Sequence, residues 1–286
     1  MGLRSLIIGG DGLIGAHLRH ALEANNGTVY ATTRRKNTND IYFDLSISKP
    51  RNIKFPAVDT VFICAGMTGF KDCQDNARLA QKVNVDAPRE IAEQFSHAGA
   101  HIIYLSTSAV FDCNQSKMQH DLCKFPKSIY GKTKSEGEDL ILKVGEGMSV
   151  LRLTKVVHNN LLIFKKWSEL LRGEKNIQAF IDLYFCPIMI EDVIKALIAI
   201  AERGIGGVYQ VSGESDISYY DAALTLANTL KVNPSLVRPC RATESGILAE
   251  NILRYTSLDT SSLPDELNFI PPKPIDVLKK IYEKLI

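Results

Sequence analysis

Tyr130 and Lys134 are the two residues whose types and spacing most directly suggest chemistry. On a helix, residues four apart lie one turn apart on the same face, so the phenol and the ammonium would point the same way. A cation close to a phenol favours the ionised form, and such a pair can transfer a proton to or from a substrate oxygen. The spacing alone is common by chance. The prediction therefore depends on whether the surrounding elements supply the rest of a redox site.

A glycine-rich turn near the start of the chain would supply a dinucleotide site. An apolar strand over 3–8 runs into this turn, and a helix over 13–25 follows it. Glycines permit the tight turn and let a pyrophosphate approach the backbone, while free N–H groups of the new helix face the phosphates. The spacing can be read as Gly10-x-Gly12-x-x-Gly15 or as Gly9-x-x-Gly12-x-x-Gly15, and the alternative is a plain turn. The predicted cofactor contacts are Gly9, Gly12, Leu13, Ile14 and Gly15.

The second predicted strand, 28–32, leads into a run of cations, Thr33-Arg34-Arg35-Lys36. An NAD site usually has an acidic residue here for the ribose hydroxyls, whereas guanidinium groups bind a 2′-phosphate through two hydrogen bonds. We therefore expect NADP(H) as the cofactor, bound by Arg34 and Arg35, with NAD(H) left open. The alternative is a solvated basic turn.

Two later strands should end in the same crevice. The strand over 58–63 leads into Cys64-Ala65-Gly66, and the strand over 100–105 leads into Ser106-Thr107-Ser108. Ligands of parallel sheets lie at the carboxyl ends of the strands, so the small residues would face a cofactor and the hydroxyls a substrate. Between them, Asn84 lies in a helical stretch over 74–97, in which Pro88 predicts a kink or break. A buried Asn needs a hydrogen-bonding partner, and a satisfied core residue is the alternative.

The alternation of strands and helices predicts an α/β fold with a doubly wound parallel sheet, which is Rossmann-like. Beyond residue 155 the pattern becomes less regular, and we expect a smaller C-terminal substrate-binding lobe there. The predicted division is a dinucleotide-binding domain at 1–157 and a mainly substrate-binding lobe at 158–286. A part of that lobe, about 177–212, is expected to return to the sheet.

Bulk composition narrows the classes of partner. With 286 residues and a net charge of +2, the chain indicates neither nucleic acid nor a membrane surface as a partner. Its six cysteines are scattered without a Cys-x-x-Cys, which is typical of a reduced, cytoplasmic protein. His17 and His20 share a helix face, but no carboxylate or cysteine cluster completes a site, so no metal is expected.

Together these features resemble the extended short-chain dehydrogenase/reductase family over most of the chain. Gly9-x-x-Gly12-x-x-Gly15 is similar to its cofactor turn, and Tyr130-x-x-x-Lys134 to its catalytic pair. Three later segments, at 151–153, 185–192 and 207–213, look most like dTDP-4-dehydrorhamnose reductases and related sugar-nucleotide reductases and epimerases. One departure is Thr107-Ser108-Ala109-Val110-Phe111, where those reductases usually carry Thr-Asp-Tyr-Val-Phe. The small residues at this place are also similar to those of sugar-nucleotide epimerases.

The resemblance implies roles for individual residues. It implies catalysis by Thr107, Tyr130 and Lys134, with Lys134 also holding the nicotinamide ribose. The further contacts that it implies are Asp44 and Leu45 at the adenine pocket, Cys64, Ala65, Gly66 and Asn84 along the cofactor, and Ser108 at the substrate. It also suggests a homodimer.

The expected activity is the NADPH-dependent reduction of a nucleotide-linked 4-keto sugar. Tyr130 would donate the proton, and Lys134 would lower its pKa from about 10 toward about 7. A diphosphate in the substrate should need cations from the lobe, and the candidates are Lys165 and Arg238, followed by Lys166, Arg172 and Arg241. Two alternatives stay open: a sugar-nucleotide epimerase or dehydratase of the same family, and a non-catalytic NADP-binding regulatory subunit like the beta subunit of methionine adenosyltransferase.

Overall fold

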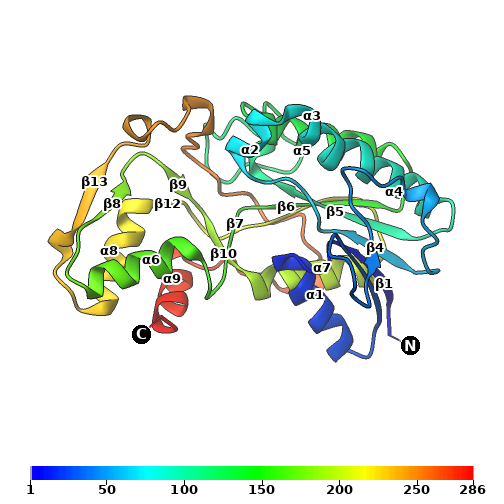
Figure 1. Ribbon diagram of the computed structural model, residues 1–286, viewed down its shortest axis with the longest axis horizontal. Coiled ribbons are helices and arrows are strands. Elements are labelled where there is room, and N and C mark those ends of the chain that lie inside the picture. The colour runs from blue at the N-terminus through cyan, green and yellow to red at the C-terminus, as the bar shows by residue number, and fades with distance from the viewer. Residues whose placement is uncertain (1, 286) are drawn as a thin grey trace.

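The structure is a computed structural model that describes residues 2–285, and a parallel sheet of seven strands forms its centre (Figure 1). The strand order is β11-β6-β5-β4-β1-β2-β3, and every neighbouring pair is parallel. The strands are β1 (Arg4–Ile8), β2 (Thr28–Thr33), β3 (Ile41–Tyr42), β4 (Thr60–Ile63), β5 (His101–Thr107), β6 (Met148–Leu153) and β11 (Gly207–Val211). The order reverses between β1 and β4, which is where such sheets bind ligands. The predicted doubly wound α/β fold is confirmed.

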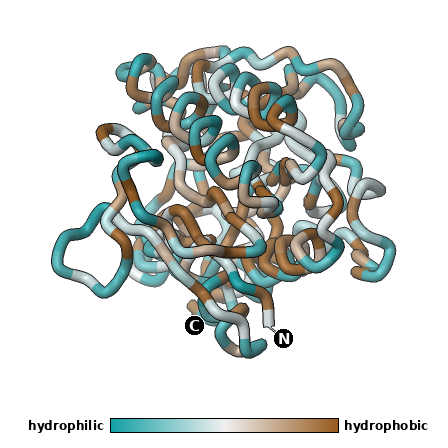
Figure 2. The backbone as a smooth tube through the Cα atoms, turned by 90° about the vertical axis from the view of Figure 1, so that its right-hand side faces the viewer, coloured by the Kyte–Doolittle hydropathy of each residue, from teal (hydrophilic) through white to brown (hydrophobic). Residues whose placement is uncertain are grey.

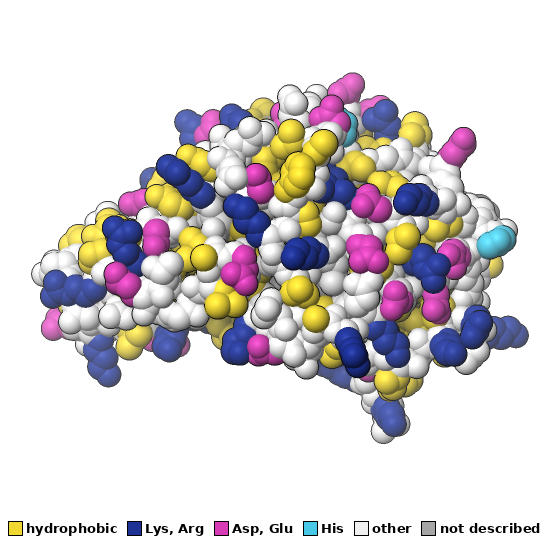
Figure 3. Space-filling view, turned by 90° about the horizontal axis from the view of Figure 1, so that it is seen from above, with side chains coloured by type: hydrophobic (Ala, Val, Ile, Leu, Met, Phe, Trp, Pro, Cys, Tyr) yellow, Lys and Arg dark blue, Asp and Glu magenta, His cyan; other side chains and the backbone are white. Residues whose placement is uncertain are grey.

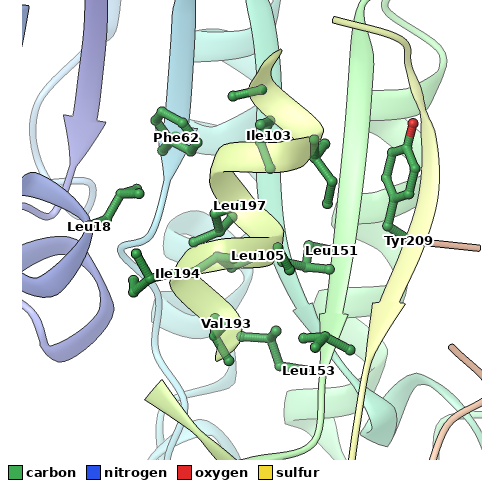
Figure 4. Packing of buried hydrophobic residues seen from close by; sticks show 14 of the residues in the cluster. Leu18, Phe62, Ile103, Leu105, Leu151, Leu153, Val193, Ile194, Leu197 and Tyr209 are labelled. Atoms are coloured by element: carbon green, nitrogen blue, oxygen red, sulfur yellow. The ribbon is translucent and has the colours of Figure 1, made fainter. Parts of the chain in front are cut away.

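Helices cover both faces of this sheet (Figure 1). On one face lie α1 (Leu13–Ala24) and α7 (Ile190–Arg203), and on the other lie α4 (Ala87–Ser96) and α5 (Ile129–Leu142). Figure 4 shows Val193, Ile194 and Leu197 of α7 pointing onto side chains of the central strands, among them Ile103 and Leu151. All five are buried, so the α7 face anchors the strands whose carboxyl ends carry the predicted site.

The helical stretch expected over 74–97 is divided into four pieces. They are α2 (Phe70–Asp75), α3 (Ala77–Gln81), a π-helical turn (Lys82–Asp86) and α4. The break falls around Pro88, at the first turn of α4, where a missing N–H costs little. Pro88 cannot donate to the carbonyl four residues earlier, which belongs to Asn84. That carbonyl instead accepts a hydrogen bond of 2.7 Å from the Tyr104 hydroxyl.

The C-terminal half contributes a second hydrophobic core. Its elements are β7 (Lys155–Val157), α6 (Leu162–Arg172), β8 (Ile177–Phe180), β9 (Tyr184–Phe185), β10 (Pro187–Met189), β12 (Ile217–Ser218), α8 (Tyr219–Leu230), β13 (Val237–Cys240) and α9 (Pro274–Glu283). Aromatic side chains fill this core, with Phe164 packed edge-to-face against Tyr282. Short 3-10 turns connect the rest, at Pro50–Asn52, Ser108–Val110, Pro234–Leu236, Thr243–Ser245, Ala249–Asn251 and Asp265–Leu267.

The segment at about 177–212 is shared between the two cores. Strand β11 pairs with β6 in the large sheet, and α7 packs against α1. Strand β8 pairs instead with β13, and β10 pairs with β7, outside the large sheet. The division of the chain at residue 157 stays a prediction.

The charged residues are spread over the surface, as the small net charge of +2 leads us to expect (Figure 3). Figure 2 shows hydrophobic residues gathered along the inner segments and hydrophilic residues on the outer loops. Acidic and basic side chains are interspersed over the face drawn in Figure 3. Within residues 2–285, no helix is long and apolar enough to cross a membrane.

Candidate active site

The start of α5 is built to bring Tyr130 close to the end of β5. The hydroxyl of Ser128 caps the helix by accepting a hydrogen bond of 3.0 Å from the Gly131 N–H. Gly131 packs directly on the 3-10 turn after β5, because a Cβ there would lie 2.2 Å from the Ala109 carbonyl oxygen. Only glycine permits this approach, and it sets Tyr130 beside Thr107.

Thr107 ends β5 and is half-buried, with its hydroxyl oxygen accepting a hydrogen bond of 3.2 Å from the Ala109 N–H. Burial raises the pKa of Tyr130 to about 12, although hydrogen bonding with Thr107 opposes the rise. The expectation that Lys134 brings this pKa toward 7 is therefore wrong for the protein without ligands. A phenol with a raised pKa stays protonated at neutral pH, which is the form that donates a proton.

Lys134 lies one turn further along α5 and is buried. Its ammonium nitrogen sits over the ring of Tyr104, 3.7 Å from the ring centroid. Burial lowers the pKa of Lys134 to about 7, while the Glu138 carboxylate and the thiols of Cys73 and Cys64 act in the opposite direction. Lys134 is thus a group that titrates near neutral pH.

A buried ion pair fixes the inner face of α5. Glu138, with no exposed surface, accepts hydrogen bonds of 3.0 and 2.8 Å from the Arg152 guanidinium of β6, and it also pairs with Lys124. Arg152 donates a further bond of 2.8 Å to the carbonyl of His120. Because these charges satisfy one another with bidentate geometry, they hold α5 in register with the sheet.

Asn84 links α5 to the loop after β4. Its side chain is fully buried, accepts from the Met67 N–H at 2.8 Å, and donates to the Met67 carbonyl at 2.9 Å and to the Thr133 hydroxyl at 3.1 Å. All of its polar groups are satisfied within the protein. Asn84 therefore positions the loop that begins with Cys64-Ala65-Gly66, and its contact with a cofactor stays a prediction.

The glycine-rich turn fits a dinucleotide pyrophosphate. Gly9 has a φ of +89°, and a Cβ at Gly15 would lie 2.2 Å from the Gly9 carbonyl oxygen, so helix and turn approach too closely for any side chain. Gly12 begins α1 without a side-chain cap, which leaves the N–H groups of Leu13, Ile14 and Gly15 for an anion. Both spacings share this geometry, but the closest backbone approach joins Gly9 and Gly15.

The basic end of β2 lies beside an acid. Arg34 and Arg35 are exposed, and the Arg35 side chain pairs with Asp11 of the glycine-rich turn at 3.3 Å. Asp44 accepts hydrogen bonds from Ser46, which, with the charges of Arg34 and Lys82, lower its pKa against the opposing effect of burial. The side chain of Leu45 belongs to the hydrophobic core instead of an open surface.

A cavity of about 930 Å³ joins the start of α1, the loop after β4, the end of β5 and the start of α5, whereas the glycines of the turn, Asn84 and the basic end of β2 are not in its lining. Its walls contain the predicted residues Ile14, Cys64, Ala65, Gly66, Thr107, Ser108, Tyr130 and Lys134. From the C-terminal half come Leu183, Tyr184, Phe185, Tyr219, Thr256, and part of the segment at 245–253. Lys165 and Arg238 lie outside this lining, and their contact with a substrate stays a prediction. A cation that sequence reasoning missed, Lys155, is in the cavity wall, and only the place of its strand could have revealed it.

The described residues contain no group of three or more His, Cys, Asp or Glu side chains placed to hold a metal ion.

The fold and this cavity define a class of protein, the nucleotide-dependent α/β enzymes whose Tyr and Lys lie on the helix after the hydroxyl-bearing strand. Comparison with known families is more specific. The model of the family described as RmlD substrate binding domain matches residues 3–285, and the chain belongs to this family. The resemblance to sugar-nucleotide oxidoreductases of the extended short-chain dehydrogenase/reductase type is thereby confirmed.

Some relatives are named as sugar-nucleotide reductases, and others as the beta subunit of methionine adenosyltransferase. The dTDP-4-keto-6-deoxy-D-glucose reductase of Streptomyces niveus is 26% identical over 244 residues, which are 82% of each chain. The methionine adenosyltransferase 2 subunit beta of Xenopus tropicalis is 25% identical over 254 residues, which are 83% of this chain and 75% of that protein. The solved dTDP-4-dehydrorhamnose reductase of Bacillus anthracis, in complex with NADP, has a TM-score of 0.84 and 20% identity, and the match covers 99% of this chain and 100% of that one.

Proposed function

We propose that this chain is an NADP-dependent reductase of a nucleotide-linked 4-keto sugar. The observation that carries the proposal is the meeting of Thr107, Tyr130 and Lys134 in one cavity that also reaches Ile14 at the uncapped start of α1. The reductase names among the relatives, and the NADP bound to the solved Bacillus anthracis reductase, support the choice of substrate and cofactor.

The bound cofactor supplies the hydride. The proton comes from the chain itself: the Tyr130 phenol, kept protonated by burial, donates to the substrate oxygen. Thr107 can hydrogen-bond the same oxygen and share the charge that develops on it. Lys134, with a pKa of about 7, takes up and releases a proton at little cost and can return one to the cavity after each turnover.

A consumption assay tests the proposal. NADPH oxidation is followed with a panel of 4-keto nucleotide sugars, and NADH is run beside it. We expect turnover with at least one 4-keto sugar and faster turnover with NADPH. Tight retention of cofactor with conversion of the sugar but no net NADPH consumption would instead indicate an epimerase.

The beta-subunit relatives favour a second candidate, a non-catalytic NADP-binding regulatory subunit. This candidate predicts NADP binding and a stoichiometric enzyme partner, without turnover by the isolated chain. Co-purification of the tagged protein from its source cells, followed by the same assay with and without the partner, separates the two functions.

A further inference from the structure

The cavity wall contains a cation that the proposed reaction does not use. Lys155 begins β7, directly after the strand that pairs with the catalytic strand β5. Its side chain is open to the solvent of the cavity, yet enough protein surrounds it that burial lowers the pKa of its ammonium group. An ammonium group in such a concave setting is better solvated by an anion than by apolar walls.

Lys155 has no partner among residues 2–285. It forms no ion pair with a carboxylate, and desolvation is the only influence on its pKa. The other two cations in the cavity wall are engaged: Lys71 pairs with Asp75 at 2.6 Å, and Lys134 lies over the Tyr104 ring. Lys155 is therefore the free positive charge in the described cavity wall.

Its place relative to the catalytic hydroxyl follows from the strand register. Thr107 pairs with Leu153 across β5 and β6, and Lys155 is two residues further along. Two residues of extended chain span at most about 7 Å, so the Cα atom of Lys155 lies within that distance of the Cα atom of Leu153. Thr107 and Lys155 line the same cavity. The ammonium can thus reach a group next to the carbonyl held by Thr107.

The backbone fixes this position. The Lys155 N–H donates to the Cys186 carbonyl at 3.0 Å, and β7 pairs in parallel with β10. Cys186 in turn donates its N–H to the Thr256 hydroxyl at 2.8 Å. The lysine therefore stands on a rigid junction between the large sheet and the C-terminal core, and its side chain alone adapts to a ligand.

We propose that Lys155 is a substrate-binding residue that pairs with an anionic oxygen of the substrate, a phosphate or a carboxylate, close to the carbonyl being reduced. The inference rests on the proposed function, because the anion is placed next to the reacting sugar. We call the side of the cavity lined by Lys155 and by residues of the C-terminal half, such as Tyr184 and Tyr219, the substrate wall. A single lysine would make this wall selective for a charged ligand.

Binding, measured apart from turnover, tests the inference. Calorimetric titration into the NADP⁺ complex compares wild type, Lys155→Met and Lys155→Arg with two probes. These are dTDP-glucose, whose anions are phosphates, and dTDP-glucuronic acid, which adds a carboxylate to the sugar. We expect Lys155→Met to weaken binding about tenfold to a hundredfold, the range for a hydrogen bond to a charged group. Lys155→Arg should keep most of the affinity.

The two probes identify the source of the anion. An equal loss for both indicates a phosphate, and a loss confined to dTDP-glucuronic acid indicates a carboxylate. The matched control is Lys279→Met, which removes an exposed lysine of α9 and should leave both affinities unchanged.

Three results overturn the inference: equal affinities in wild type and Lys155→Met, an equal loss of NADP⁺ affinity in that variant, or no binding of either probe to wild type. Failure of the proposed function has a different signature. In that case the probes bind and depend on Lys155, but no 4-keto nucleotide sugar causes NADPH oxidation.

Discussion

The two walls of the cavity are built in different ways. Behind the wall that we expect to hold the cofactor, here called the cofactor wall, backbone packs on backbone. A Cβ at Gly15, next to the lining residue Ile14, or at Gly131, next to the lining residue Tyr130, would lie 2.2 Å from a carbonyl oxygen. On the substrate wall, side chains such as Leu183, Tyr184 and Tyr219 face the cavity, together with residues next to the 3-10 turns at 243–251. A backbone contact leaves no choice of residue, whereas a side chain can be exchanged for another of similar size.

Because of this difference, the residues expected to carry out the reaction are positioned independently of the side chains expected to select the substrate. Thr107, Tyr130 and Lys134 are positioned by close backbone approach and by the buried Glu138–Arg152 pair. In the described cavity lining, the substrate wall presents one unpaired cation, Lys155, among hydroxyl and amide groups such as those of Tyr184, Tyr219 and Asn251. We infer that one scaffold can keep its proton chemistry while side chains on the opposite wall change the ligand.

The largest effect is expected at the phenol of Tyr130, the proton donor of the proposed reaction. Tyr130→Phe should lower kcat about a thousandfold, because proton donation by a positioned group contributes on the order of 10² to 10⁴ in rate. The ring and its edge-to-face contact with Phe70 are kept, so folding should be unchanged. The measurement is steady-state NADPH oxidation with saturating substrate. The matched change on the opposite wall, Tyr184→Phe, should alter KM by a few-fold and leave kcat in place. Equal kcat values for Tyr130→Phe and wild type would remove Tyr130 from the mechanism.

A smaller effect, on stability, is expected at Lys134. The pKa of Lys134 is about 7 in the folded state and 10.5 as its ordinary value. Between these values the unfolded state binds more protons, so this lysine destabilises the fold most at and below pH 7, and its cost disappears as the pH rises through 10.5. Lys134→Met should therefore gain about 2 kcal/mol more unfolding free energy at pH 7 than at pH 9, because the pH dependence reaches its full slope of about 1.36 kcal/mol per pH unit only above the folded-state pKa.

The measurement for Lys134→Met is urea unfolding at the two pH values. The control is Lys132→Met, an exposed lysine of the same helix whose effect should not depend on pH. A gain that is the same at pH 7 and pH 9 would show that Lys134 keeps its ordinary pKa. The titrating groups around it are Glu138, Cys64, Cys73 and the tyrosines at 104 and 130, and none is altered by either change.

The third effect concerns the glycine that lets α5 approach β5. Gly131→Ala places a methyl group against the Ala109 carbonyl, and such overpacking should cost about 2 kcal/mol and move Tyr130 away from Thr107. Gly173→Ala, in the C-terminal half, is the matched change: its Cβ would meet ordinary contacts at 3.5 Å, so stability should stay within about 0.5 kcal/mol. Thermal unfolding and kcat check both variants. Full activity in Gly131→Ala would show that backbone approach does not position the phenol.

Local patterns predicted much of this molecule. The bounds expected for β1, α1 and β2 agree with the structure to within one residue, because their periodicity and their end signals lie within each segment. The place of Lys155 could not be predicted, since it depends on the pairing of β7 with β10, more than thirty residues later. The hydrogen bond from the Tyr104 hydroxyl to the Asn84 carbonyl could not be predicted either, because it also joins two separate elements. The prediction that Lys134 lowers the pKa of Tyr130 was wrong, because the spacing of two residues along a helix does not show how deeply the phenol is buried.

The smallest effect is expected at the ribose end of the cofactor wall, where selection depends on exposed side chains and not on backbone approach. Arg34→Ser should raise the Kd for NADPH about tenfold and leave the Kd for NADH unchanged, as the loss of one charged hydrogen bond to a 2′-phosphate would do. Arg35→Ser should cost less, because that guanidinium is already paired with Asp11 at 3.3 Å. Fluorescence titration of both cofactors measures the ratio. An unchanged NADPH-to-NADH ratio in Arg34→Ser would mean that these arginines are only a solvated turn. A changed ratio would show that side-chain selection is not confined to the substrate wall, and that the rigid part of the site is limited to the elements around Gly15 and Gly131.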